Sequence, residues 1–441
     1  MKRIYILITS IIFITSCQSV NPEWEQQSLN PELLHKSMKK LSDVIVYDIF
    51  SPPQASRNYV YPSIAAYEVL RHTDENYKSM AGQLKGLNSI PLPQADVTYN
   101  YSLASVIAFL KVSKALIFSE EKIQTFQNEV LQEFNEFRMP DDVYERSLAY
   151  GNEVADHILN WADKDNYKET RSFPKYTVTE DPAKWKPTPP GYMDGIEPAW
   201  NKIRTFVIDS AQQFQPPFPT DYNMNEGSTF YEEVMEVYTV VNDAGDEEKE
   251  IASFWDCNPY VLNVTGHIMH ATKKITPGGH WIGITAIACR KAEADMLETT
   301  RAYMMTSIAL ADAFISCWDE KYRSNLTRPE TVINEHIDEK WLPILQTPPF
   351  PEYTSGHSVI SSAAAIVLTD IFGDNFEFED DVEVEYGLPV RKFKSFLHAS
   401  EEAAVSRLYG GIHYRPAIDN GVTQGRALGR FILKNTVTKE S

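Results

Sequence analysis

Three short polar segments in the last third of the chain decide its interpretation: KYRSNLTRP at 321–329, YTSGH at 353–357 and SRLYGGIH at 406–413. In the first, Lys321 and Arg328 would share one face of a continuous helix, about 10 Å apart. The proline that follows predicts instead that the helix stops before it, which lets Arg328 turn inward.

The second and third segments combine helix-end signals with polar side chains. Ser355 is a typical helix N-cap, and Gly356 lets the backbone approach a ligand closely. The free N–H groups at the start of a helix favour an anion. The two glycines of the third segment are expected to end a helix and to fold His413 back toward Arg407.

Each segment alone is weak evidence, because a single arginine or histidine is usually a solvated charge or a structural group. Together they supply two histidines, two arginines, a lysine and a Ser-Gly turn. The forked donors of arginine suit oxyanions, and three cations would neutralise a trivalent, phosphate-like group. The three segments therefore predict one oxyanion pocket.

The pattern K-x6-R-P, S-G-H, S-R-x5-H resembles the three-part signature of the type-2 phosphatidic acid phosphatase superfamily, which includes the vanadium-dependent haloperoxidases. With flanking helices the resemblance covers roughly residues 230–436. It implies vanadate as the cofactor, or phosphate in a phosphatase. It implies that His413 is the protein ligand of vanadate or the phosphate nucleophile, and that His357 is the general acid/base. The residues it implies for oxyanion binding are Lys321, Arg328, Ser355, Gly356 and Arg407.

Further positions favour the haloperoxidase branch. Trp318 stands three residues before the lysine, and Phe350 stands five before Ser355, where the resemblance implies a wall of the halide pocket. WDCNPY at 255–260 and PGGHW at 277–281 resemble the bacterial haloperoxidase-like group. Three residues of these segments are candidate pocket or support groups, with helix-end, packing or structural roles as the alternatives: Asp256 as a partner of Arg407, Tyr260 as a phenol donor, and His280.

Two departures from the family pattern affect the predicted pocket. Thr354 replaces the proline usual before Ser-Gly-His, which loosens the turn but should preserve its donors. Ala417 stands where the family usually has an aspartate, four residues after His413. Asp419 is then the candidate to orient that histidine, with a backbone carbonyl as the alternative.

The leading hypothesis is a vanadate-dependent haloperoxidase, an enzyme that oxidises halide with hydrogen peroxide. Lys321 would polarise the peroxide, halide or another small substrate would attack one oxygen, and His357 would manage protons. The alternative is an acid phosphatase that acts through phospho-His413. A third hypothesis is a helical binding lipoprotein with a degenerate site.

Composition and the N-terminus constrain the location and the partners. The net charge is 41 − 61 = −20, which argues against sequence-blind binding to nucleic acid or anionic lipid. A basic start, a short apolar run and ITSC at 14–17 resemble a bacterial lipobox, with Cys17 as the lipidated residue. We therefore expect an extracytoplasmic protein, lipid-anchored to a bacterial membrane, with three other cysteines buried as thiols. Nothing in the sequence predicts the oligomeric state.

Apolar spacing of the helical type predicts a mainly α-helical chain. The family resemblance implies an all-α fold of paired helical bundles, as in vanadium haloperoxidases and acid phosphatases. The expected divisions are a signal peptide (1–16), a tether (17–30), an N-terminal helical region (31–219) and a helical catalytic domain (220–441).

Within these divisions, helices are expected at 102–117, 120–137 and 141–161, and helical patterning dominates from 260 to 305. A proline-rich linker or lid is expected at 167–219, and a minor β-hairpin at 376–386.

Overall fold

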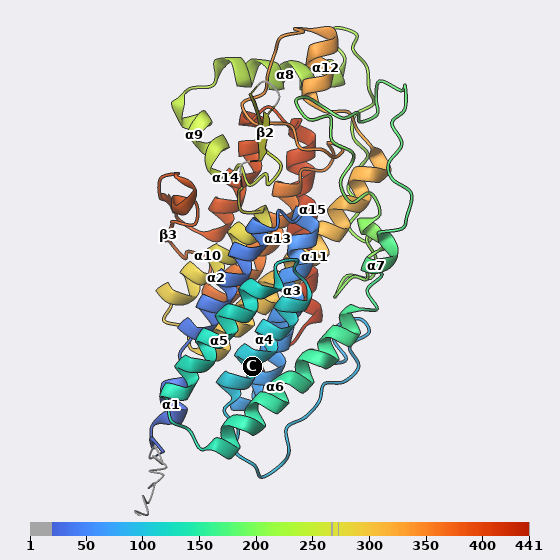
Figure 1. Ribbon diagram of the computed structural model, residues 1–441. Helices are drawn as coiled ribbons and strands as arrows, with labels where there is room; N and C mark the ends of the chain where they lie inside the picture. Colours follow the sequence, from blue (N-terminus) through green and yellow to red (C-terminus); the bar gives the residue numbers. More distant parts are fainter. Residues whose placement is uncertain (1–19, 266–267, 272, 441) are drawn as a thin grey trace, which may run out of the picture.

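The computed structural model describes residues 20–440 except 266, 267 and 272. Helices of the N-terminal half lie at one end of an elongated molecule, and the later helices extend to the other end (Figure 1). The N-terminal helices are α1 (Trp24–Ser28), α2 (Glu32–Tyr47), α3 (Pro52–Leu70), α4 (Tyr101–Ala115), α5 (Glu120–Glu136), α6 (Asp141–Ala162) and α7 (Tyr167–Thr170). The all-α prediction is confirmed, and α4, α5 and α6 match the predicted helices within two residues.

The second half contains eight more helices and two small antiparallel pairs of strands among the described residues. The helices are α8 (Thr229–Asp243), α9 (Asp246–Phe254), α10 (Pro277–Lys291), α11 (Met296–Ser324), α12 (Pro329–His336), α13 (Gly356–Phe372), α14 (Phe396–Tyr409) and α15 (Arg415–Asn435). The strand pairs are β1 (Leu262–Thr265) with β2 (Ile268–Ala271), and β3 (Phe378–Asp380) with β4 (Arg391–Phe393).

Helix ends follow local capping chemistry. Ser51 accepts a hydrogen bond from the Gln54 N–H at 3.3 Å, and Pro52 occupies the first turn of α3, where its missing N–H costs nothing. The 29-residue α11 begins at an N-cap, Asp295, and ends at Asn325, a left-handed residue with φ 54°. These ends position the lysine of the first segment near the C-terminus of the longest helix.

One hydrophobic core joins the two halves of the chain. Helix α11 packs against α3 from the first half and against α13 from the second. The main cluster of buried apolar side chains extends from Trp24 to Ile432. The predicted boundary at residue 219 therefore does not separate two hydrophobic cores.

The proline-rich segment after α7 packs as a fixed cover. Asp312 of α11 accepts hydrogen bonds from the N–H groups of Phe206, Val207 and Ile208, at 2.7, 2.8 and 3.0 Å. Trp200 is fully buried in the same segment. The segment has no long helix, as predicted. The interpretation of the segment as a linker or lid is wrong, because these hydrogen bonds tie it to α11.

Three other expectations need correction. The expected tether, residues 17–30, includes helix α1, and Trp24 of this helix lies in the hydrophobic core. Burial removes the apolar indole surface from water, which stabilises the folded state. The expected helical run from 260 contains the β1–β2 hairpin instead. The predicted hairpin at 376–386 supplies only β3, because its partner β4 lies further along the chain.

Candidate active site

The first polar segment spans the end of α11 and the start of α12. Helix α11 ends at Ser324, before Pro329, as predicted. Arg328 is the N-cap of α12 in an extended conformation, and Pro329 begins that helix. The Arg328 side chain is fully buried and donates from Nε to the Phe350 carbonyl at 3.0 Å and from Nη1 to the Ile412 carbonyl at 2.7 Å. Its Nη2 is buried without a hydrogen-bond partner in the described part of the chain. One guanidinium edge is therefore left for a ligand.

The second segment forms the N-terminus of α13. Ser355 caps the helix by accepting a hydrogen bond from the Ser358 N–H at 3.3 Å, as predicted. A Cβ added at Gly356 would come no closer than 3.8 Å to Trp318, so this glycine leaves open space at the first turn. The first N–H groups of a helix have no intrahelical acceptor, which makes this turn a source of anion-binding donors.

The third segment ends α14 and returns His413 to the first two segments. The helix stops at Tyr409, and Gly411 adopts φ 76°, a conformation that favours glycine. His413 Nε2 then lies 3.2 Å from Arg328 Nη1, across 85 residues of sequence. Arg407 Nη2 donates to the Trp255 carbonyl at 2.7 Å, which holds its fork in place.

A small pocket lies where the segments meet. Gly356, His357, Arg407 and His413 line its polar side. Its apolar side includes Phe314, Trp318, Phe350 and several prolines, and the Trp318 and Phe350 ring centroids are 5.0 Å apart. The structure thus confirms that the three segments converge and that the two predicted aromatic residues form a wall of the same pocket.

Glu352 orients His413, and the sequence analysis missed it. The His413 Nδ1 lies 2.8 Å from Glu352 Oε1, which also accepts the Tyr414 N–H at 3.0 Å. Asp419 is exposed, so its predicted role is wrong, and Ala417 contributes only its carbonyl, to the Ser355 N–H. The signal was present, because Glu352 stands three residues before Ser355 in a stretch already singled out.

Burial and charge set the protonation of this pair. Burial raises the pKa of Glu352 to about 8 against the opposing effect of Arg328 and Lys321. Burial and the same two cations lower the pKa of His413 well below its ordinary value. A neutral His413 whose Nδ1–H donates to Glu352 presents the Nε2 lone pair toward the pocket.

Lys321 lies behind the pocket rather than in its wall. Its Nζ donates to the carbonyls of Pro351, Glu352 and Thr354 at 3.0, 3.0 and 2.6 Å, so all three donors are taken. Burial lowers the pKa of Lys321 to about 7. In this arrangement the lysine supports the turn before Ser355 and supplies positive charge. Its direct action on peroxide stays a prediction.

His357 faces the pocket with an unused nitrogen. Its Nε2 is buried and has no hydrogen-bond partner among the described residues. Burial, followed by the nearby charge of Arg407, lowers the pKa of His357 well below its ordinary value. The ring is therefore neutral and able to accept a proton, as its predicted acid/base role requires.

The three lower-ranked candidates lie close to the pocket in other roles. Asp256 lines the pocket and forms an ion pair with Lys274. Burial lowers the pKa of Arg407 to about 10, and the negative charge of Asp256 opposes this shift, so Asp256 also acts on Arg407 as predicted, although no ion pair joins the two among the described residues. Tyr260 is not among the pocket-lining residues, and its backbone carbonyl accepts from Gln346. His280 is fully buried in a cluster of its own, outside the pocket lining.

The donor set fits a vanadate-like oxyanion. Two buried nitrogens, Arg328 Nη2 and His357 Nε2, have no partner in the described chain. They face a site that also contains His413, the Arg407 guanidinium and a helix N-terminus. An oxyanion held through His413 Nε2 would accept a hydrogen bond from Arg328 Nη2, and a protonated oxygen of the same group would donate to His357 Nε2. Without such partners both atoms are costly to bury.

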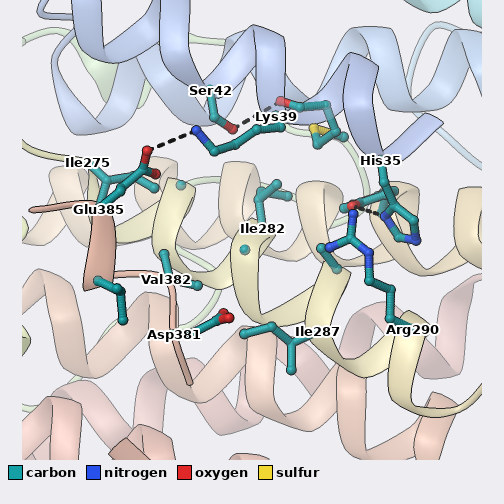
Figure 2. A pocket seen from close by; sticks show the side chains of 16 residues that line it. His35, Lys39, Ser42, Ile275, Ile282, Ile287, Arg290, Asp381, Val382 and Glu385 are labelled. Atoms are coloured by element: carbon teal, nitrogen blue, oxygen red, sulfur yellow. Dashed lines mark hydrogen bonds and ion pairs between the residues drawn. The ribbon is translucent and has the colours of Figure 1, made fainter. Parts of the chain in front are cut away.

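A larger hollow of about 460 Å³ lies elsewhere, between α2 and α10 (Figure 2). His35 and Lys39 line it from α2, and Ile282 and Arg290 line it from α10. None of the described residues of the three segments contributes to its lining. Its size therefore does not make it the candidate active site.

Comparisons with known proteins agree with this geometry. A family model described as the VCPO second helical-bundle domain matches residues 301–439. The solved structure of a bacterial vanadium-dependent iodoperoxidase is 54% identical, with 94% of this chain and 98% of that chain covered and a TM-score of 0.89.

A holo-type bacterial vanadium-dependent chloroperoxidase shares the fold at 16% identity, with 88% of this chain and 94% of that chain covered and a TM-score of 0.65. No curated protein matches the chain.

Proposed function

The chain belongs to the vanadium-dependent haloperoxidases, and we propose that it oxidises halide with hydrogen peroxide, with iodide as the preferred halide. The observation that carries the activity is the convergence of His357, Arg407 and His413 on one pocket, with Arg328 Nη1 3.2 Å from His413 Nε2. Bound vanadate would supply the Lewis-acid centre that activates peroxide.

The chain's own residues hold the cofactor and prepare it for reaction. His413 Nε2 would be the ligand atom, and the ring is fixed by the hydrogen bond to Glu352. Arg328 Nη2, the Arg407 guanidinium and the first N–H groups of α13 would donate hydrogen bonds to the oxygens of the bound group. These donors are in place before reaction, so they stabilise developing negative charge without reorganisation.

His357 moves the proton. Its neutral Nε2 accepts a proton from incoming hydrogen peroxide and returns it to the oxygen that leaves as water or hydroxide. Burial, and after it the charge of Arg407, lowers the pKa of His357 and keeps the imidazolium form unstable, so the proton is returned rather than stored. Lys321 contributes at longer range, by holding the carbonyls of the turn that contains Glu352.

The apolar wall supports iodide as the halide. Phe314, Trp318 and Phe350 line the pocket, and Phe350 is held by Lys321 and Arg328, whose charged groups each lie 5.1 Å from its ring centroid. Entry into such a site strips water from the halide, and the cost of removing that water falls as the ion becomes larger. Of the three halides, iodide has the lowest desolvation cost and is also the most easily oxidised. The 54% identity to an iodoperoxidase supports the same choice.

The test is a paired assay on one preparation of apoprotein reconstituted with orthovanadate. We expect vanadate-dependent oxidation by peroxide in the order iodide, bromide, chloride. Absence of turnover with all three halides would contradict the activity, and a chloride preference would contradict the halide choice. Acid-quench trapping of a phosphoenzyme that disappears in His413→Ala would instead support the acid phosphatase alternative.

We also propose that the mature chain is lipid-anchored through Cys17 and lies outside the cytoplasm. Cys17 lies outside the described residues, and the support is the basic start, the apolar run and the ITSC sequence. Among the described residues, no helix is long and apolar enough to cross a membrane. Wild-type protein should sediment with membranes, and Cys17→Ser should not. Equal sedimentation of both proteins would contradict the anchor.

A further inference from the structure

A second group of reactive side chains lies beside the active site and takes no part in the proposed reaction. We call it the His280 cluster; its members are Cys257, His280, Asp380 and Glu383. Cys257 follows α9, His280 lies in the first turn of α10, and the two acids belong to β3 and the turn after it. All four side chains are at most 2% exposed.

Three ligand atoms of the cluster are spaced as the corners of one face of a metal tetrahedron. Cys257 Sγ lies 3.4 Å from His280 Nδ1, which lies 3.2 Å from Glu383 Oε1, and Sγ and Oε1 are 3.7 Å apart. Zinc bonds of about 2.3 Å to sulfur and about 2.0–2.1 Å to nitrogen or oxygen give tetrahedral edges of about 3.3–3.6 Å. The observed edges are within about 0.2 Å of that range, the tolerance expected of a metal site.

We propose that the His280 cluster binds a divalent transition-metal cation of the zinc class through Cys257 Sγ, His280 Nδ1 and Glu383 Oε1. Sulfur and imidazole ligands favour zinc over magnesium or calcium, which prefer sets of oxygen ligands. Three protein ligands leave the fourth position to water or to another small ligand. This binding site is independent of the proposed haloperoxidase activity.

Asp380 supplies the outer contact that metal-bound histidines usually make. His280 Nε2 lies 2.8 Å from Asp380 Oδ2, so the proton on Nε2 leaves Nδ1 free to face Cys257 and Glu383. The other carboxylate oxygen of Asp380 accepts the Val382 N–H at 3.1 Å. The Trp255 ring stacks on the imidazole with centroids 4.7 Å apart. The ring orientation is therefore held from two sides.

The charges of the cluster call for a cation. Among the described residues, no lysine or arginine forms an ion pair with Asp380 or Glu383. Arg407 of the active site donates to the carbonyls of Ala252 and Trp255 and to Ser406, and among the described residues it forms no ion pair with either acid. A buried carboxylate is costly without a positive partner. In a metal-free cluster the imidazole itself has to be that partner, whereas a bound divalent cation would replace its proton.

The chain segments that carry the proposed metal ligands also contribute to the larger hollow and to the oxyanion pocket. Asp381, Val382 and Glu385 line the larger hollow (Figure 2). Asp380 and Glu383, from the same segment, contact His280 in the cluster. Cys257 itself lines the oxyanion pocket, and the carbonyl of Trp255, two residues earlier, holds Arg407. A metal would thus tie the 380–383 turn and α10 to the wall that positions an active-site arginine.

The direct test is metal binding by the full-length chain. After incubation with zinc and desalting, mass spectrometry of the metal content should find about one zinc per chain. Cobalt(II) in place of zinc should give an intense near-ultraviolet absorption from the thiolate–cobalt bond. Both measurements use wild-type protein, so they do not depend on whether a variant folds.

Substitutions then assign the ligands. Cys257→Ser and Glu383→Gln should retain less than about a tenth of the zinc. Asp380→Asn should bind about 10–100-fold more weakly. The matched control is Cys289→Ser, which removes another buried cysteine from the helix that carries His280 and should keep both the zinc and the cobalt absorption. Circular dichroism verifies that each variant is folded.

Three results would overturn the proposal: a wild-type chain that retains no zinc, a cobalt spectrum without thiolate absorption, or a folded Cys257→Ser variant with undiminished metal.

Discussion

Two buried histidines of this protein, His413 and His280, are held alike but surrounded by opposite charges. Each has one ring nitrogen 2.8 Å from a buried carboxylate, Glu352 for His413 and Asp380 for His280. The second nitrogen of His413 faces Arg328, whereas that of His280 faces Glu383 and Cys257.

The surroundings reverse the acid–base behaviour of the two rings. Burial and the neighbouring cations lower the pKa of His413 well below its ordinary value. Burial opposes protonation of His280 as well, but Asp380 and Cys257 hold its pKa well above the ordinary value. A carboxylate partner alone therefore does not decide what a histidine site binds. The charges at the second nitrogen prepare one site for an anion and the other for a cation.

The largest expected effect comes from removing the histidine on the anion side. His413→Ala should abolish measurable vanadate binding, because it removes the ring nitrogen that would bind the vanadium and that Glu352 holds in position. His398→Ala removes an exposed histidine and is the matched control. Titration calorimetry with vanadate measures both, and retained binding in a folded His413→Ala variant would show that this histidine is not the ligand.

The carboxylate behind His413 should matter less than the histidine itself. Glu352→Gln keeps the size of the side chain but weakens its acceptance of the His413 proton, so vanadate affinity should fall about 10–100-fold. The exposed Glu335→Gln is the control. A purely structural role would lower stability without changing affinity, so an unfolding titration alongside calorimetry separates the two roles.

The affinity of the oxyanion pocket for vanadate should fall as the pH rises. The pKa values of about 7 for Lys321 and about 8 for Glu352 mean that the first group loses a positive charge and the second gains a negative one. Both steps make the site more negative, so vanadate affinity should fall, by up to about tenfold per pH unit above pH 7.

The Lys321→Met variant has no lysine to deprotonate, whereas the ionisation of vanadate in solution is the same for both proteins. The ratio of wild-type to variant affinity should therefore decline through pH 7. A ratio that is constant with pH would show that Lys321 does not titrate in the site.

The smallest effect is expected at the halide wall. Phe350→Leu removes the aromatic contact with Trp318, worth about 0.5–1.5 kcal/mol, so the preference for iodide over chloride should fall roughly two- to twelvefold. Phe118→Leu, at an exposed position, should leave the ratio unchanged. Steady-state kinetics with both halides decide, and an unchanged ratio in Phe350→Leu would remove the wall from the explanation of halide choice.

The contrast between the two histidine sites also explains what sequence reasoning can reach. The oxyanion pocket was predictable because its parts are local signals: the proline after Arg328, the cap at Ser355 and the glycines before His413. The helices α4 to α6 were predictable for the same reason, because their apolar spacing is a local property.

The missed features depend on tertiary contacts. The carboxylate that orients His413 comes from 61 residues earlier, so the search near Ala417 and Asp419 found the wrong partner. The three donors of Lys321 are taken by backbone carbonyls, which no side-chain motif reveals. The His280 cluster joins segments 100 and more residues apart, and its two acids belong to a stretch that was predicted only as a minor β-hairpin.

The most direct test of the central claim, that the three segments form one anion site, is a vanadate titration of Arg407→Ala. Its charge lies 79 residues from Arg328 in sequence, and both guanidinium groups are buried at the pocket that contains His413. Loss of one charge-assisted partner costs about 2–4 kcal/mol, so affinity should fall roughly 30- to 1000-fold while circular dichroism remains that of the wild type. Unchanged affinity in a folded Arg407→Ala variant would mean that the three segments do not act as one site.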